Sequence, residues 1–340
     1  MLSGWLGQRM QFNQLRRREF ITLLGGAAVA WPLGARAQQA AKVARIGFLG
    51  LAPAAAWAAP IEAMRARLRD LGHIEGKNLV IEWRWAENVG QLSELASQLV
   101  HTDVDLIFAY SSTEVEAARQ ATRTIPIVFA VHADPIGVGH VESLPRPGGN
   151  ITGLSDLLTA LIPKQLEILK DAIPGARRVG VLWNPSTPSH VVAVKAVEAG
   201  GEKLGLELLM VPAHTAEEFP RAFSTMMQAR VEGFVAVASP LTHLQRAQLA
   251  ELAFKHRLPG IFSRRENVEA GGLMSYGADR TDLYRRAAVY IDKIFKGAKP
   301  ADLPVEQASR YQLVINMKTA KALGRDLPPS FYWRADEVIE

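Results

Sequence analysis

Short apolar segments alternate with amphipathic segments along most of this chain, and no other feature limits its fold as strongly. Runs such as 43–49 and 127–131 have the length and composition of buried strands. Between such runs, apolar residues recur every three or four positions, as on one face of a helix. Strands that are apolar throughout and are separated by helices form parallel sheets covered on both faces. The sequence therefore predicts an α/β fold.

Proline and glycine residues at 145–150 divide this alternation into two parts of similar length. Before them we expect strands at 43–49, 79–85, 105–109 and 127–131, with helices at 61–71, 92–100 and 113–122. After them we expect helices at 159–172, 188–204, 217–228 and 241–256, and strands at 178–183, 206–211, 233–238 and 258–262. The 340 residues suffice for about two domains. The expected architecture is therefore two Rossmann-like lobes with parallel sheets.

The first 37 residues have the three regions of a secretory signal peptide. A basic run at 16–18 precedes an uncharged stretch at 20–35, and Ala35-Arg36-Ala37 forms a small-x-small cleavage site. The uncharged stretch is shorter than the roughly 20 residues that a spanning helix needs. Arg17-Arg18 also resembles the twin-arginine export signal. We expect cleavage near Ala37 and a periplasmic mature chain. The twin-arginine and general secretory routes both stay open, as does an ordinary amphipathic helix.

Charge and cysteine content exclude several classes of function. The formal net charge is +5, but five basic residues and one acidic residue lie in the first 37 positions, so the remainder carries only +1. A nucleic-acid partner therefore has little electrostatic support. The chain has no cysteine, which excludes disulfide scaffolds, zinc-thiolate sites and thiol catalysis.

Polar residues follow several predicted strands, at the sheet edge where open parallel sheets bind ligands. The candidates in these loops are Ser112, Thr113, Asp134, Asn184, Ser186, Thr187, Ser239 and Ser263, with Asp156 near a further strand end. Serine and threonine at a helix start often serve only as caps. Where such loops converge from two lobes, their hydroxyls and free N–H groups also suit a carboxylate. Asp134 and Asp156 are each either a turn residue or a partner for an ammonium group.

No catalytic or cofactor motif stands out. The patterns HExxH, GxSxG, GxxxxGK[ST] and GxGxxG are absent from the sequence. The eight histidines are scattered without metal-ligand spacing, and we expect them at the surface or at helix caps. The pattern predicts neither metal nor cofactor and indicates a binding protein rather than an enzyme.

Several long segments of the chain are jointly specific: LGHIEGKNLVIEWRW, ATRTIPIVFAVHADPIGVG, SLPRPGGNITGLS, LPGIFSRRENVEAGGLMSYG, DLYRRAAVYIDKIFKGAKPADLPVEQ and LVINMKTAKALG. In these segments the chain resembles the periplasmic substrate-binding proteins of ABC importers, in the branch with tryptophan- and other amino-acid-binding members. The resemblance runs from the export signal to the last residue.

This resemblance implies a type I periplasmic-binding fold, in which two lobes close on a ligand. It implies one lobe at 42–153, with part of 278–300 returning to it. The other lobe lies at 154–277, with part of 301–340 crossing back. Carried over by position, the ligand contacts are Ser112, Thr113, Asp134, Asp156, Asn184, Ser186, Thr187 and Tyr276, and the loop pattern adds Ser239.

The resemblance implies an amino acid or related small carboxylate as ligand, delivered to ABC permease subunits in the inner membrane. We expect a monomer. Two alternatives stay open: an enzyme on a similar two-lobed scaffold, such as a sugar-nucleotide epimerase, and an effector-sensing regulatory domain. The first would need paired catalytic groups, and the second an N-terminal helix-turn-helix.

Overall fold

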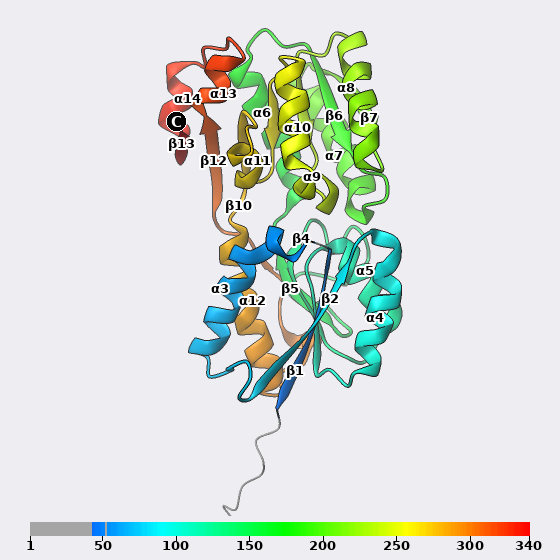
Figure 1. Ribbon diagram of the computed structural model, residues 1–340. Coiled ribbons are helices and arrows are strands. Elements are labelled where there is room, and N and C mark those ends of the chain that lie inside the picture. The colour runs from blue at the N-terminus through cyan, green and yellow to red at the C-terminus, as the bar shows by residue number, and fades with distance from the viewer. Residues whose placement is uncertain (1–42, 52) are drawn as a thin grey trace, which may run out of the picture. The chain divides into compact units, whose positions relative to one another are not determined.

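The computed structural model describes residues 43–51 and 53–340, so the signal peptide predicted for residues 1–37 lies outside the described residues. Residues Ala44–Glu340 form one compact unit. This unit contains two sheets, each with helices on both faces, and thus two α/β lobes (Figure 1). None of the helices among the described residues has both the length and the apolar character needed to cross a membrane.

The first lobe is built on a six-stranded sheet with the order β11-β5-β4-β3-β1-β2. Its strands are β1 (Ala44–Leu51), β2 (Leu79–Ala86), β3 (Leu106–Ala109), β4 (Ile127–His132), β5 (Ile151–Ser155) and β11 (Glu306–Gln307). All adjacent pairs are parallel. The helices of this lobe are α3 (Ala58–Asp70), α4 (Leu92–His101), α5 (Ser112–Ala121) and α12 (Arg280–Phe295), with 3₁₀ turns at Ala54–Trp57, Val89–Gln91 and Pro300–Asp302.

Alternate residues of β1 build two separate cores. Ile46 and Phe48 pack on one face with side chains of α3 and α12. Leu49 and Leu51 pack on the other face with α4 and α5. Because both faces of the strand are apolar, the sheet needs helices on both sides, as the sequence predicts.

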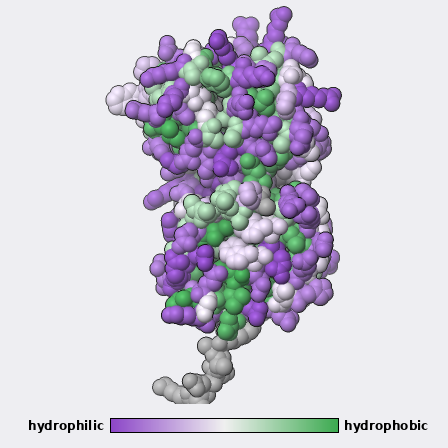
Figure 2. Space-filling model, viewed as in Figure 1, coloured by the Kyte–Doolittle hydropathy of each residue, from purple (hydrophilic) through white to green (hydrophobic). Residues whose placement is uncertain are grey.

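The second lobe is built on a seven-stranded sheet with the order β13-β12-β10-β9-β8-β6-β7. Its strands are β6 (Arg178–Trp183), β7 (Glu207–Pro212), β8 (Gly233–Ala236), β9 (Gly260–Phe262), β10 (Met274–Ala278), β12 (Tyr311–Asn316) and β13 (Glu337–Ile339). Its helices are α6 (Leu158–Ala172), α7 (Pro188–Leu204), α8 (Phe219–Gln228), α9 (Pro240–Leu244), α10 (Arg246–Lys255), α11 (Arg265–Glu269), α13 (Met317–Ala322) and α14 (Pro329–Arg334), with a 3₁₀ turn at Ala216–Glu218. The outward faces of its helices are largely hydrophilic on the side that Figure 2 shows.

The chain passes between the two sheets three times within the described residues. It leaves the first sheet after β5 and enters α6 through Asp156-Leu157. It returns from β10 to α12 through Asp279, and it crosses again between β11 and β12 at 308–310. β10 leaves the second lobe and β12 enters it, so these neighbours run antiparallel. All other adjacent pairs of the second sheet are parallel.

Most of the predicted elements are confirmed, one prediction is wrong, and one strand is missing from the expected list. A single helix was expected at 241–256, but the helix is interrupted at Gln245, whose φ of −97° and ψ of 24° end α9 before α10 begins. The list of expected strands also leaves out 151–155, although Asp156 is expected near a strand end, and β5 lies there and pairs with β4. Gly153 lies in the middle of this strand, and glycine lowers the strand propensity of the segment. Its φ is +150°, and a Cβ there would lie 2.0 Å from the Phe129 carbonyl oxygen, so the close approach of β4 requires glycine.

Candidate ligand-binding site

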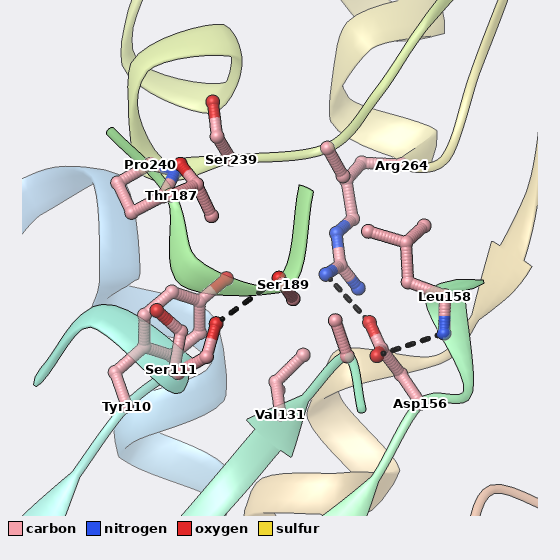
Figure 3. A pocket seen from close by; sticks show the side chains of 13 residues that line it. Tyr110, Ser111, Val131, Asp156, Leu158, Thr187, Ser189, Ser239, Pro240 and Arg264 are labelled. Atoms are coloured by element: carbon pink, nitrogen blue, oxygen red, sulfur yellow. Dashed lines mark hydrogen bonds and ion pairs between the residues drawn. The ribbon is translucent and has the colours of Figure 1, made fainter. Parts of the chain in front are cut away.

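A cavity lies between the two lobes, beyond the carboxyl ends of their strands (Figure 3). Its empty space, including the part open to solvent, is about 350 Å³, but the centre of a water molecule can occupy only about 20 Å³ of it, so the cavity is narrow in this structure. It is lined from the first lobe by Tyr110, Ser111, Ser112, Val131 and Ala133, from the β5–α6 crossing by Asp156 and Leu158, and from the second lobe by Thr187, Ser189, Ala238, Ser239, Pro240 and Arg264. Both lobes therefore contribute to one wall.

The first turns of two helices from different lobes meet at this cavity. Ser111 caps α5, and its hydroxyl donates to the Glu114 carboxylate over 2.5 Å. Thr187 stands at the N-cap position of α7. Next to these caps, the Ser112 and Ser189 hydroxyl oxygens lie 3.3 Å apart across the lobes. Helix N-termini carry free N–H groups and partial positive charge, so this meeting point favours an anionic group such as a carboxylate.

A buried ion pair forms the opposite wall. Arg264 Nη2 donates to Asp156 Oδ2 over 2.8 Å, and both side chains are less than a tenth exposed. Asp156 Oδ1 accepts a further hydrogen bond from the Leu158 N–H over 3.3 Å. Asp156 thus connects the crossing segment with the residue that precedes α11.

A second cluster joins the lobes beside the cavity. Arg280, at the start of α12, donates to the Tyr110 hydroxyl over 3.3 Å and pairs with Glu266 of α11. The His243 ring lies 4.6 Å from the Trp57 ring. Burial and the Arg280 charge lower the pKa of His243 to about 3. Burial alone would raise the pKa of Glu266, but the Arg280 guanidinium lowers it to about 2. These groups hold the two lobes together.

The structure places four of the predicted contacts on the cavity wall: Ser112, Asp156, Thr187 and Ser239. Thr113, Asn184 and Ser186 line an adjoining cleft of about 980 Å³ of empty space, partly open to solvent, which shares Thr187 and Pro240 with the cavity. The remaining two line neither space. The Asp134 carboxylate accepts from the Gly137 N–H over 2.7 Å within its own turn, and the Tyr276 carbonyl accepts from Gln165 over 2.7 Å.

Sequence reasoning missed Arg264, Ser189 and Tyr110. Arg264 follows a predicted strand end, but only the fold shows that it is buried whereas Arg265 is largely exposed. Ser189 is the second residue of α7, behind the expected cap position, where a hydroxyl residue carries no specific signal. Tyr110 directly follows β3, and its type and apolar neighbours indicate an ordinary core residue.

The histidines differ from the expectation of surface or capping positions. Four of them, His132, His140, His190 and His243, are buried. His140 links His132, at 2.8 Å, to the Glu116 carboxylate, at 2.7 Å. His190 accepts from the Asn184 N–H and bonds the Ala238 carbonyl, so it fixes the loop before α7. Their burial lowers the pKa values of all four rings. No group of potential metal ligands occurs among residues 43–51 and 53–340.

Two lobes, three crossings and a shared cavity define the type I periplasmic-binding architecture, a class of two-lobed binding proteins. A leucine-binding protein from Thermotoga maritima has this fold with a TM-score of 0.54, at 15% identity over 77% of this chain and 78% of its own. Residues 56–339 match the family model described as ABC transporter substrate binding protein. The chain belongs to this family of binding proteins, which are not enzymes.

Two similar proteins are described together with the ligand that they bind. The chain is 30% identical to a tyrosine-binding protein of Clostridioides difficile over 257 residues, which are 75% of this chain and 74% of the relative. A solved domain from Streptococcus pneumoniae in complex with L-tryptophan is 27% identical, with a TM-score of 0.80 over 87% of this chain and 99% of its own.

A third relative was solved without ligand. The ligand-free, open structure of a substrate-binding protein with adhesive properties from Clostridium difficile is also 27% identical over 87% of this chain and 99% of its own, with a TM-score of 0.65. At equal identity and coverage, the present structure is thus more similar to the complex with L-tryptophan than to this open form.

Proposed function

We propose that this chain binds an aromatic L-amino acid between its lobes and delivers it to the permease of an ABC importer. The observation that carries the proposal is the cavity wall, where two helix N-termini from different lobes face a buried carboxylate and guanidinium. The helix N-termini and the guanidinium both suit an α-carboxylate, and the carboxylate of Asp156 suits an ammonium group. The tyrosine and tryptophan named for the relatives support the aromatic side chain.

The adjoining cleft supports a bulky side chain. It shares Thr187 and Pro240 with the cavity, and its apolar lining includes Leu51, Val89, Leu241 and Leu244. An amino acid with its charged atoms in the cavity can therefore extend its side chain along these residues.

Closure of the lobes is the second part of the proposal. The moving bodies are the two lobes, and the crossings at 156–157, 279 and 308–310 act as the hinge. A ligand that touches both lobes favours the closed arrangement, which the permease then recognises. The contact between Ser112 and Ser189 and the similarity to the tryptophan complex support a closed arrangement here.

Export completes the proposal. We infer that residues 1–37 are a signal peptide and that the mature protein acts in the periplasm, where an importer collects its substrate. N-terminal sequencing of the protein from the periplasmic fraction should begin near Gln38. A full-length chain that stays in the cytoplasmic fraction would contradict this.

Titration calorimetry of the mature chain tests the proposed ligand. L-tryptophan or L-tyrosine should bind with one-to-one stoichiometry, and at 100 times its dissociation constant should raise the free energy of unfolding by about 2.7 kcal/mol. The D-enantiomers serve as controls and should bind more weakly, because inversion misplaces one of the two charged groups. A folded chain that binds neither L-amino acid would refute the proposal.

A further inference from the structure

One buried ion pair carries all the formal charge on the cavity wall. Arg264 is 7% exposed and Asp156 is 3% exposed. The other eleven lining residues are uncharged. The wall therefore presents one positive and one negative group side by side, and its net charge is zero.

The guanidinium of Arg264 has N–H donors that remain available to a ligand. Its bond to Asp156 is the single hydrogen bond that its guanidinium donates within the part of the chain that the structure describes, although the group carries five N–H bonds. Figure 3 shows the guanidinium reaching from the second lobe into the cavity. A carboxylate matches the planar guanidinium with two parallel hydrogen bonds.

Asp156 has acceptor positions to spare. Its two oxygens accept one hydrogen bond each, from Arg264 and from the Leu158 N–H. An ionised carboxylate offers about four acceptor positions. An ammonium group can therefore bind Asp156 while the bond to Arg264 remains.

We propose that Arg264 and Asp156 together recognise the zwitterionic head group of the amino acid, with Arg264 binding the α-carboxylate and Asp156 the α-ammonium group. This inference rests on the proposed function and adds what selects the ligand. An amine without a carboxylate leaves Arg264 without its ligand partner, and an acid without an amine does the same to Asp156. The neutral wall thus disfavours ligands that carry a net charge at their head group.

Calorimetry with L-tryptophan, tryptamine and indole-3-propionate tests this on the wild type, Arg264→Gln and Asp156→Asn. The wild type should bind L-tryptophan at least about 100-fold more tightly than either analogue. Arg264→Gln should weaken L-tryptophan by about 30-fold or more and leave tryptamine as tight as before or tighter, so that the preference collapses. Asp156→Asn should remove the preference over indole-3-propionate instead.

Two further variants keep the test interpretable. Arg265→Gln makes the same change at a neighbour whose side chain is 45% exposed and pairs with Glu337, and it should bind like the wild type. Should a single change unfold the chain, the double variant Asp156→Asn/Arg264→Gln removes both buried charges, and it should bind all three probes within about tenfold of one another.

The outcomes separate the two claims. If the wild type binds L-tryptophan and its preference over both analogues survives in Arg264→Gln and in the double variant, the zwitterion inference is overturned and the proposed function stands. A parallel loss for all three probes would mean a structural role only, and would overturn it too. If the wild type binds neither L-tryptophan nor L-tyrosine, the proposed function fails, and this inference fails with it.

Discussion

Replacing Ser112 and Ser189 by cysteine should give a protein in which an oxidant forms a disulfide between the lobes and so blocks entry of the ligand. The two hydroxyl oxygens lie 3.3 Å apart across the lobes, so a disulfide needs an approach of only about 1 Å to reach its bond length. The natural sequence contains no cysteine, so no other thiol competes. The bond would tie the first turns of α5 and α7 together at the cavity. If fewer than about 1% of molecules can then open, association with L-tryptophan slows at least 100-fold.

Stopped-flow fluorescence measures this rate on one protein before and after reduction. Reduction should restore fast binding, and ligand added before oxidation should become trapped. The single variants Ser112→Cys and Ser189→Cys are the controls, and the oxidant should not change their rates. An oxidised double variant with a confirmed disulfide that binds as fast as its reduced form would show that the ligand does not enter between these helices.

Acid should destabilise the protein well before its carboxylates titrate. Burial lowers the pKa of His190 to about 4. In the unfolded chain the same ring takes up a proton near its ordinary pKa of 6.5. The unfolded state therefore binds more protons as the pH falls from 6.5 toward 4, and the free energy of unfolding falls with it. Between pH 7.5 and 5.0 His190 alone should account for about 2 kcal/mol, and His132, His140 and His243 act in the same direction.

Urea denaturation at pH 7.5 and pH 5.0 checks this prediction. His190→Gln should be less stable than the wild type at pH 7.5 but should lose less on acidification. His256→Gln changes a histidine outside these buried contacts and should keep the wild-type dependence. A wild-type free energy of unfolding that is equal at both pH values would contradict the buried, neutral state of these rings.

The sequence predicts the two-lobed α/β architecture because apolar strands and amphipathic helices each carry their own period. The direction of a strand and its pairing partners leave no such periodic signal in the sequence. β12 runs antiparallel to β10 because the chain crosses between lobes there, and nothing local to Tyr311–Asn316 encodes that return. β5 escapes prediction for a different reason, since Gly153 is required by a tertiary contact and weakens the strand pattern.

The same limit applies to the site. Loop position and residue type select Ser112, Asp156, Thr187 and Ser239, which line the cavity, but they also select Asp134, whose carboxylate is bound within its own turn. They do not indicate that Arg264 pairs with Asp156, because those residues are 108 positions apart and come together only through the fold. The spacing of the histidines in the sequence likewise does not indicate that four of them are buried. It follows from loop contacts such as that between His190 and Ala238.

A crystal structure of the protein grown with L-tryptophan tests the central claim most directly. We predict the amino acid between the lobes, with its carboxylate within hydrogen-bonding distance of Arg264, its ammonium group at Asp156 and a contact to Ser112 of the first lobe. Two results would contradict the account. Tryptophan could be bound on the outer face of one lobe, or it could be bound in a different cavity, which is lined by Ala59, Ser263 and Gln312.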